Sequence, residues 1–269
     1  MKSRLNTKSL FGYVPYIFSK KVAKWHTSSL KRKKEFLHID DKDGHLALYT
    51  LSFGLNATVY EPNENFLYGG KEDVPVNIPN TEDYIFINQM IKGLEDRAKL
   101  NFVEDGLNMI NRNFYEVDDL NKYVYVTACR SLDRESNKHI PMDIKINKLK
   151  NSVAEEGYLY IEYLIATKEE DFNNYPASSY LRKDEILKYF NTDEWTILAN
   201  EIKIIKDELT PLNRNNEEKI VGYLDVRRKK SPRIKEKRKL KNKKRIDFVT
   251  NKEVKCKHCY IINGVLRWI

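Results

Sequence analysis

The chain has 269 residues and a net charge of +9, with 41% hydrophobic residues, 12% aromatic residues, 10 glycines and 8 prolines. This length and composition exclude a minimal peptide module and a disordered or low-complexity chain. No apolar run approaches the roughly 18 residues of a membrane span. Three cysteines and the lack of a signal-peptide pattern lead us to expect a cytoplasmic, reducing location and no membrane partner.

The charge is distributed unevenly along the chain. Residues 1–35 hold ten basic residues and one acid, residues 227–245 hold 13 basic residues and one acid, and the stretch between them is acidic overall. So dense a basic block buries little apolar surface, and we expect an exposed arm that neutralises RNA or DNA phosphates. A solubilising tail, or a clamp on the acidic core, is the alternative. The residues assigned to nucleic-acid binding are Arg227, Arg228, Lys229, Lys230, Lys237, Arg238, Lys239, Lys243, Lys244 and Arg245.

Hydrophobic patterns in the first half predict alternating strands and helices. Residues 34–39 (KEFLHI) form an apolar run typical of a strand, and residues 45–53 (HLALYTLSF) have helical spacing before Gly54. Residues 56–60 (NATVY) predict a second strand, which completes a β-α-β unit and implies a parallel sheet. We next expect an amphipathic helix and a weak strand, over residues 82–99 and 109–114.

The second half continues the alternation and ends differently. The expected elements are a strand over 123–128, a helix over 143–153, a buried strand over 157–166, a short helix over 181–190 and strands over 195–205 and 219–226. A polar loop joins the last two strands, which predicts an antiparallel hairpin. The fold class is therefore α/β, with a Rossmann-like, doubly wound, mostly parallel sheet, a terminal antiparallel hairpin and a small C-terminal element.

We expect four segments along the chain. They are a basic N-terminal lead (1–35), an α/β domain (36–228), a basic arm (229–245) and a small hairpin-like element (246–269).

Three stretches of the α/β domain carry a family resemblance. LHIDDKDGHLALY covers the first strand and turn, VYEPN ends the second strand, and EEGYLYIEYL begins a later strand with glycine. With the closing hairpin, residues 36–228 resemble the class I S-adenosylmethionine (SAM)-dependent methyltransferases, particularly the compact small-molecule type of the tellurite-resistance enzymes. The resemblance implies a SAM-dependent methyltransferase that acts on a nucleic acid or a small acceptor.

The resemblance also implies a cofactor site at the carboxyl ends of the first strands. In that site Glu61 accepts the ribose hydroxyls, the turn that ends at Gly44 lies near the amino acid part of SAM, and Asn113 lies near adenine. The residues implied to bind the cofactor are His38, Asp40, Gly44, Glu61 and Asn113.

The first turn departs from the family's pattern. His38 stands in place of an acid, and Asp40 and Lys42 stand at two glycine positions. One hypothesis is that Asp40, Asp41 or Asp43 has taken over the contact with the ammonium of SAM. The alternative is a catalytically inactive protein of this fold that binds nucleic acid or a protein partner through its basic arm. A nonmethylating reaction on SAM is a third hypothesis.

Candidate catalytic residues follow or lie within the later strands, because open α/β sheets bind ligands beyond the carboxyl ends of strands. The pocket-mouth candidates are Cys129, Arg130, Ser131, Asp133 and Arg134. Glu162 is a carboxylate inside an apolar strand, where such a group is paired or lies at a cavity. We take Arg130, Asp133 and Glu162 as catalytic candidates, and we expect Cys129 and the tyrosines around Glu162 to pack in the core.

The tail contains a cysteine pair. Cys256 and Cys259 have the spacing of half a zinc site, but a structural zinc needs four ligands and no second pair exists. We therefore expect free thiols in a small hairpin, in which YIING turns into VLRWI, and we treat zinc as the alternative.

Overall fold

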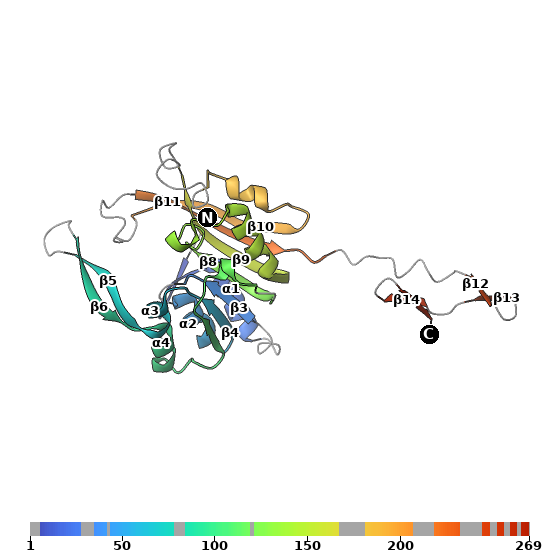
Figure 1. The fold of residues 1–269 in the computed structure, drawn as a ribbon, viewed down its shortest axis with the longest axis horizontal. Helices are drawn as coiled ribbons and strands as arrows, with labels where there is room; N and C mark the ends of the chain where they lie inside the picture. The colour runs from blue at the N-terminus through green and yellow to red at the C-terminus, as the bar shows by residue number, and fades with distance from the viewer. Residues whose placement is uncertain are drawn as a thin grey trace. The chain divides into compact units, whose positions relative to one another are not determined.

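The computed structural model of the protein describes residues 6–27, 35–41, 44–77, 84–118, 121–166, 181–206, 218–231, 244–247, 252–255, 259–262 and 265–268. The chain divides into two compact units, Met1–Lys230 and Ser231–Ile269. Figure 1 shows the ribbon of the chain, with labels on many of its helices and strands. None of the helices in the described ranges is long and apolar enough to cross a bilayer.

Within the described residues, seven strands form the central sheet of the first unit (Figure 1). Its spatial order is β10-β11-β9-β8-β3-β4-β7. β11 runs antiparallel to β9 and β10, whereas the other neighbours pair in parallel, so the expected mostly parallel sheet with a terminal antiparallel hairpin is confirmed. The strands are β3 (Glu35–Ile39), β4 (Asn56–Tyr60), β7 (Leu107–Ile110), β8 (Tyr123–Cys129), β9 (Val153–Ile165), β10 (Trp195–Lys206) and β11 (Glu218–Arg228).

The strand order reverses between β3 and β8. From β3 the chain adds β4 and β7 on one side, and it then returns to place β8 on the other side of β3. At such a switch point the connections after the two neighbouring strands lead to opposite faces of the sheet, which leaves a crevice at their carboxyl ends.

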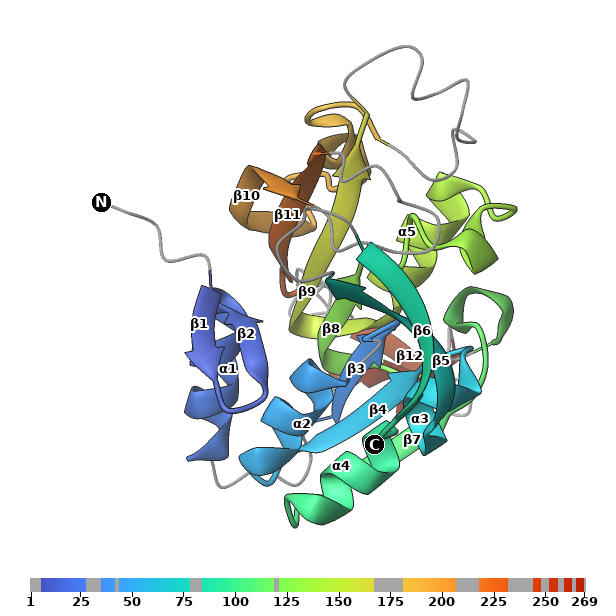
Figure 2. The same ribbon diagram turned by 90° about the vertical axis from the view of Figure 1, so that its left-hand side faces the viewer.

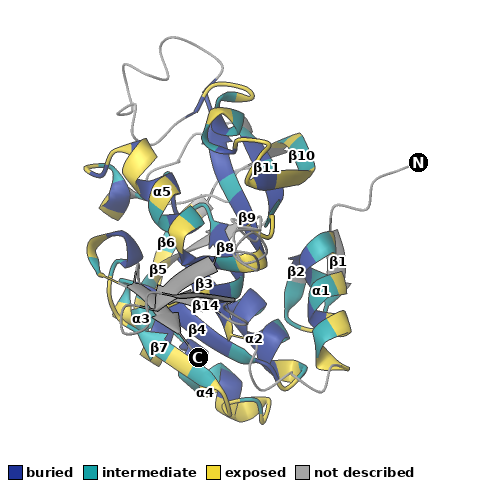
Figure 3. Cartoon of the chain, turned by 90° about the vertical axis from the view of Figure 1, so that its right-hand side faces the viewer, coloured by how far each residue is buried: buried dark blue, intermediate teal, exposed yellow. Residues whose placement is uncertain are grey.

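Helices cover both faces of this sheet (Figure 2). Side chains of α1, α2 and α4 share buried clusters with one face, and side chains of α5 and η4 share the cluster of the other face. Figure 3 shows the same layering, because the central strands are mostly buried and exposed positions lie on the outer helices. The helices are α1 (Tyr16–His26), α2 (His45–Ser52), α3 (Glu64–Tyr68), α4 (Leu94–Leu100), α5 (Met142–Ser152) and the 3-10 helices η2 (Phe114–Glu116), η3 (Glu135–Asn137) and η4 (Glu185–Tyr189).

Part of the segment that the sequence marks as a basic lead contributes to the core. Residues 6–26 form the hairpin of β1 (Asn6–Ser9) and β2 (Gly12–Pro15), followed by α1. Phe18 and Val22 are fully buried one turn apart, and the ring of Phe18 meets that of Tyr125 edge-on, with centroids 5.1 Å apart. A count of charges does not reveal this short apolar face.

The helix predicted over residues 82–99 is wrong over most of its length. Residues 84–91 form β6 (Tyr84–Ile91), which pairs antiparallel with β5 (Gly70–Asn77) in a separate ribbon. Only α4 is helical in this region, and it begins after Gly93, whose backbone lies so close to Gly69 that a Cβ there would be 2.2 Å from the Gly69 nitrogen. The apolar spacing of YIFINQMI matched a helix, but cross-strand hydrogen bonds with β5 made it a strand.

The remaining differences are local. The short helix expected over 181–190 is the 3-10 helix η4, which is wound more tightly than an α-helix. In the second unit, β12 (Lys244–Asp247) pairs with β13 (Lys252–Lys255). The hairpin predicted at the end of the chain is confirmed, since β14 (Cys259–Ile262) pairs with β15 (Val265–Trp268).

Replacing Phe18 by alanine tests the place of α1 in the core. The substitution empties a fully buried aromatic position, and we expect it to destabilise the protein by about 3–5 kcal/mol in urea unfolding. Leu10→Ala is the control, because Leu10 is 98% exposed and its loss should change the free energy of unfolding by less than about 0.5 kcal/mol. Equal effects of the two substitutions would contradict the packing of α1.

Candidate functional site

Two buried acids lie side by side at the switch-point end of the sheet. Asp40 follows β3 and Glu61 follows β4, and their exposed fractions are 5% and 1%. The register of the two parallel strands pairs Ile39 with Tyr60, and the Asp40 amide donates to the Tyr60 carbonyl at 3.0 Å. The backbone pairing of β3 and β4 therefore brings the two carboxylates together.

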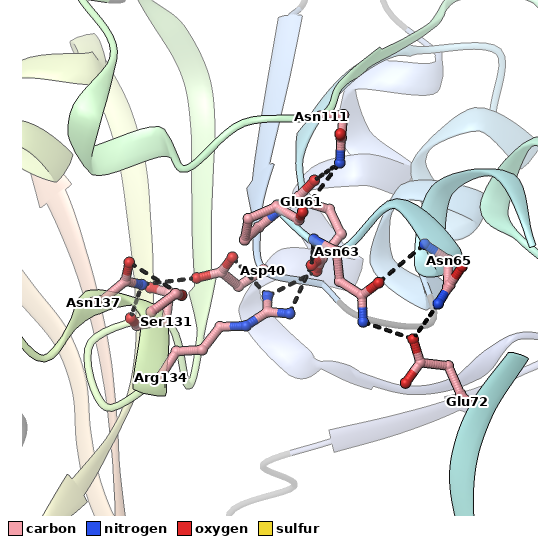
Figure 4. A network of polar contacts seen from close by, with 11 residues as sticks. Asp40, Glu61, Asn63, Asn65, Glu72, Asn111, Ser131, Arg134 and Asn137 are labelled. Atoms are coloured by element: carbon pink, nitrogen blue, oxygen red, sulfur yellow. Dashed lines mark hydrogen bonds and ion pairs between the residues drawn. The ribbon is translucent and has the colours of Figure 1, made fainter. Parts of the chain in front are cut away.

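Arg134 lies between these carboxylates (Figure 4). Its Nη1 is 2.8 Å from Asp40 Oδ1 and 2.9 Å from Glu61 Oε2, and its Nη2 is 2.7 Å from Glu61 Oε1. The contact with Glu61 is bidentate, which is the strongest arrangement of a guanidinium on a carboxylate. Because Arg134 belongs to the segment after β8, side chains from the ends of three adjacent strands meet at one point.

Burial and pairing act in opposite directions in this cluster. Burial raises the pKa of Asp40 to about 6, although the charge of Arg134 and hydrogen bonds from Arg134 and Asn137 oppose that shift. Burial by itself would lower the pKa of Arg134, but its bonds and ion pairs with Glu61 and Asp40 raise it overall, so the guanidinium stays charged. The cluster holds two acids and one cation, and it favours a cationic partner.

Asparagines support the cluster from both sides (Figure 4). The backbone amide of Asn63 donates to Glu61 Oε1 at 2.8 Å, and Asn111 Nδ2 donates to the Glu61 carbonyl at 3.0 Å. Asn137 Nδ2 reaches Asp40 Oδ2 at 3.2 Å and the Ser131 carbonyl at 2.7 Å. These bonds fix the carboxylates before any ligand arrives.

Two asparagine side chains at the start of α3 extend this support outward. The side-chain Nδ2 atoms of Asn63 and Asn65 both donate to Glu72 Oε1 at 2.8 Å. The sequence EPNEN signals only a turn, so these asparagines were not expected to belong to the site.

Asp41 closes the N-terminus of α2. Its Oδ2 accepts hydrogen bonds from the amides of Leu46 and Ala47, each at 3.0 Å, and its Oδ1 is 3.2 Å from His45 Nδ1. Gly44 has a positive φ of 68°, and a Cβ there would lie 2.5 Å from a methyl group of Leu94. Gly44 therefore allows the turn and its close packing against Leu94. The carboxylate of Asp41 occupies backbone amides at the N-terminus of α2, which are groups that suit an anion. Lys42 and Asp43 lie outside the described residues.

His38 and Asn113, which are also implied to bind the cofactor, have other hydrogen-bond partners than Asp40 and Glu61. His38 is fully buried, with Nδ1 2.8 Å from Thr127 Oγ1 and Nε2 3.2 Å from Thr50 Oγ1. Burial lowers the pKa of His38 to about 4, so its imidazole is neutral at physiological pH. Asn113 begins η2, where its side-chain oxygen accepts from the Tyr115 amide at 3.0 Å. Its contact with adenine stays a prediction.

The catalytic candidates form two local pairs. Arg130 binds Asp133, with Nε and Nη2 both 2.9 Å from Asp133 Oδ2. Glu162 accepts a hydrogen bond of 2.5 Å from the Tyr160 hydroxyl, and burial raises the pKa of Glu162. Ser131 bonds the Tyr115 hydroxyl at 2.7 Å. These candidates lie at the ends of β8 and within β9, on the side of the switch point away from β4.

The basic residues assigned to nucleic acid have different surroundings. Arg227 pairs with Glu156 at 2.9 Å, Arg228 donates to the Val153 carbonyl at 2.7 Å, and Lys229 Nζ contacts the Thr192 carbonyl. Lys230 is exposed at the end of the first unit. Lys244 and Arg245 belong to β12 and Cys259 to β14, whereas Lys237, Arg238, Lys239, Lys243 and Cys256 lie outside the described residues.

No protein-family model and no curated protein matches the chain. Solved structures do match. TehB from Haemophilus influenzae aligns with a TM-score of 0.52 at 16% identity, over 80% of this chain and 62% of TehB, so the chain spans about three fifths of that protein. A protein from Galdieria sulphuraria, assigned as a sarcosine dimethylglycine methyltransferase, aligns with a TM-score of 0.51 at 9% identity, over 79% and 84% of the two chains. The [4+2]-cyclase SpnF gives 0.51 at 10% identity, over 80% and 81%.

The chain has the fold of the class I SAM-dependent methyltransferases. The expected resemblance is thereby confirmed at the level of the fold. Within the methyltransferase fold, β3 and β4 are the strands whose ends carry the implied cofactor site, and the structure brings Asp40 and Glu61 together there. Sequence reasoning placed Arg134 only at the pocket mouth, since no local pattern marks an arginine whose carboxylate partner is 73 residues away.

Replacing Arg134 by alanine leaves two buried carboxylates without their cation. We expect a loss of about 3–5 kcal/mol in the free energy of unfolding at pH 8. The loss should be smaller at pH 5, because the folded-state pKa of Asp40 is about 6 with the arginine present and rises further without it. The folded variant then binds more protons than the unfolded chain, so its stability falls as pH rises through that pKa.

The control for this experiment is Arg227→Ala. The Arg227–Glu156 pair is about half exposed on both sides, and its loss should cost less than about 1 kcal/mol at either pH. If Arg134→Ala cost the same at pH 5 and pH 8, the account of the buried cluster would be refuted.

Proposed function

We propose that the protein is a SAM-dependent methyltransferase that binds SAM at the carboxyl ends of β3 and β4 and acts on a small-molecule acceptor. The observation that carries the proposal is the carboxylate pair of Asp40 and Glu61 at the switch point of a methyltransferase fold. The likeness to a protein assigned as a sarcosine dimethylglycine methyltransferase supports a small acceptor.

The residues at this point fit the adenosyl group of SAM. Both oxygens of Glu61 accept from two parallel N–H donors of Arg134, and the same two oxygens suit the neighbouring hydroxyls of a ribose. Arg134 therefore stands where a ribose would bind, and binding of SAM requires its guanidinium to leave Glu61.

The displaced guanidinium has a second use. Because Asp41 holds the amides of Leu46 and Ala47, the carboxylate of SAM needs another donor than these two amides. Arg134 is a charged donor beside the site, and it suits that carboxylate once it leaves Glu61. Asp40 then offers its negative charge to the ammonium of the ligand.

SAM, when bound, supplies an electrophilic methyl group on a sulfonium. The contribution of the chain is to hold the acceptor in line with that group and to exclude water, which supplies much of the acceleration in such transfers. The acids at the strand ends favour the cationic cofactor over its neutral product.

Titration calorimetry with SAM and S-adenosylhomocysteine tests the proposal. We expect saturable binding by the wild type and affinity lowered at least about 100-fold in Glu61→Gln, because the amide accepts only one of the two ribose hydroxyls. Glu64→Gln is the matched control, since Glu64 is exposed on α3 and should leave the affinity unchanged. Absence of binding by the wild type at millimolar ligand would favour an inactive protein of this fold.

We further propose that the basic stretch 227–245 binds RNA or DNA through its phosphates. Its 13 basic residues against one acid are the supporting observation, and Arg227 and Arg228 contribute least because their side chains are committed to the sheet. Such binding is independent of sequence and weakens as salt releases the counterions.

Deleting residues 232–245 tests this second proposal. The full chain should retain a single-stranded RNA in about 50 mM salt and release it between about 200 and 500 mM, whereas the deleted variant should release it already at the lower salt. A chain that lacks only residues 246–269 is the control and should behave as the full chain does. Retention of RNA by the variant without 232–245 would refute the assignment.

A further inference from the structure

A second group of titratable side chains lies on β8, β9 and β11. The register of these neighbouring strands sets Cys129 opposite Glu162 and Glu162 opposite Tyr223. All three residues are partly exposed, although their strands lie inside the sheet. Solvent therefore reaches the sheet next to the carboxyl end of β8, across the switch point from Glu61.

Glu162 has few partners for a carboxyl in such a place. The Tyr160 hydroxyl donates to its Oε1 at 2.5 Å, and Tyr160 is buried one pleat away on the same strand face. Within the described residues this is the one hydrogen bond that the Glu162 carboxyl accepts, and it has no ion pair there. Tyr160 thus fixes one oxygen and leaves the other for a ligand.

Two basic side chains near Glu162 are bound to other acids. Arg130 pairs with Asp133 through two nitrogens at 2.9 Å, and His45 pairs with Asp41 at 3.2 Å. Burial raises the pKa of Glu162, while the bond from Tyr160 and the charge of Arg130 lower it. A carboxyl of this kind gains from a positively charged ligand and accepts a proton readily.

The neighbouring ring also favours a cation. The Nζ of Lys203 lies 5.6 Å from the centroid of the Tyr223 ring, within the range in which an aromatic face attracts an ammonium group. Tyr223 is the register partner of Glu162, so a carboxylate and an aromatic ring meet at one position. This pairing suits a protonated amine better than a neutral alcohol or an acid.

We infer that Glu162 binds the ammonium group of an amine acceptor beside Tyr223 and takes its proton, with Tyr160 as the positioning residue. The inference deepens the proposed methyltransferase function and depends on it for the transfer step. The acceptor class is a primary or secondary amine.

The proposed reaction is a transfer of the methyl group from SAM to the nitrogen of the amine. A proton moves from the ammonium to the Glu162 carboxylate, which frees the lone pair of the nitrogen. The nitrogen attacks the methyl carbon of SAM, so that an N–C bond forms while the C–S bond breaks and its electron pair stays on sulfur. The products are the methylated ammonium and S-adenosylhomocysteine, and Glu162 returns its proton to water.

Calorimetry with benzylamine and benzyl alcohol tests the binding step without SAM. The two probes share an apolar body and differ in charge. The full-length wild type should bind benzylamine at least about 10-fold more tightly, and Glu162→Gln should abolish that preference. Glu155→Gln is the matched control, because Glu155 lies exposed on the same strand and should keep it. Equal affinity of the wild type for the two probes would overturn the inference.

Methyl transfer to benzylamine with SAM tests the chemical step. Glu162→Gln should lower kcat at least about 100-fold while the affinity for SAM stays unchanged, as expected for loss of a general base. Tyr160→Phe should lower kcat less and raise KM for the amine. This substitution removes the hydrogen bond that holds the Glu162 carboxylate in position, but it leaves the base itself in place. Unchanged kcat in Glu162→Gln, or binding of SAM by the wild type without transfer to benzylamine, would overturn the inference. Failure of the wild type to bind SAM would instead refute the proposed function, with the benzylamine comparison still deciding the amine site.

Discussion

Two carboxylates buried at adjacent strand ends repel each other and lose their hydration, so Asp40 and Glu61 depend on a cation between them. Arg134 supplies that cation, and its bidentate contact fixes the geometry of both acids. The ends of β3, β4 and β8 are tied together through this one guanidinium. The shape of the candidate site is therefore a consequence of charge compensation at the switch point.

The segment that carries Arg134 is itself anchored. Lys145 is fully buried in α5, and its Nζ donates to the carbonyls of Leu132 at 2.5 Å and Asn137 at 3.1 Å. Burial lowers the pKa of Lys145 to about 8, while the charge of Asp133 opposes that shift. With the backbone held in this way, a ligand displaces the arginine side chain more readily than the whole loop. In the proposed function, the cost of that displacement lowers the affinity for SAM.

The methyltransferase fold does not by itself decide the chemistry, because SpnF shares the fold and is a [4+2]-cyclase. The distinction rests on the groups at the strand ends. On one side of the switch point the acids suit an adenosyl ligand, and on the other side Glu162 and Tyr223 suit an amine. In the sheet, β8 separates the strands of these two groups, since β3 and β4 lie on one side of it and β9 and β11 on the other.

The sequence by itself determined the strand and helix alternation, the terminal hairpins and the position of Glu61 after a strand, because burial of one face imposes a local period on the chain. Tertiary structure decided the rest. Residues 84–91 have the spacing of a helix and became a strand by pairing with β5, and α1 joined the core by packing Phe18 on Tyr125. The bond of Arg134 to Glu61 spans 73 residues. Contacts between such distant residues leave no local pattern, since they arise only when the folded sheet brings its strand ends together.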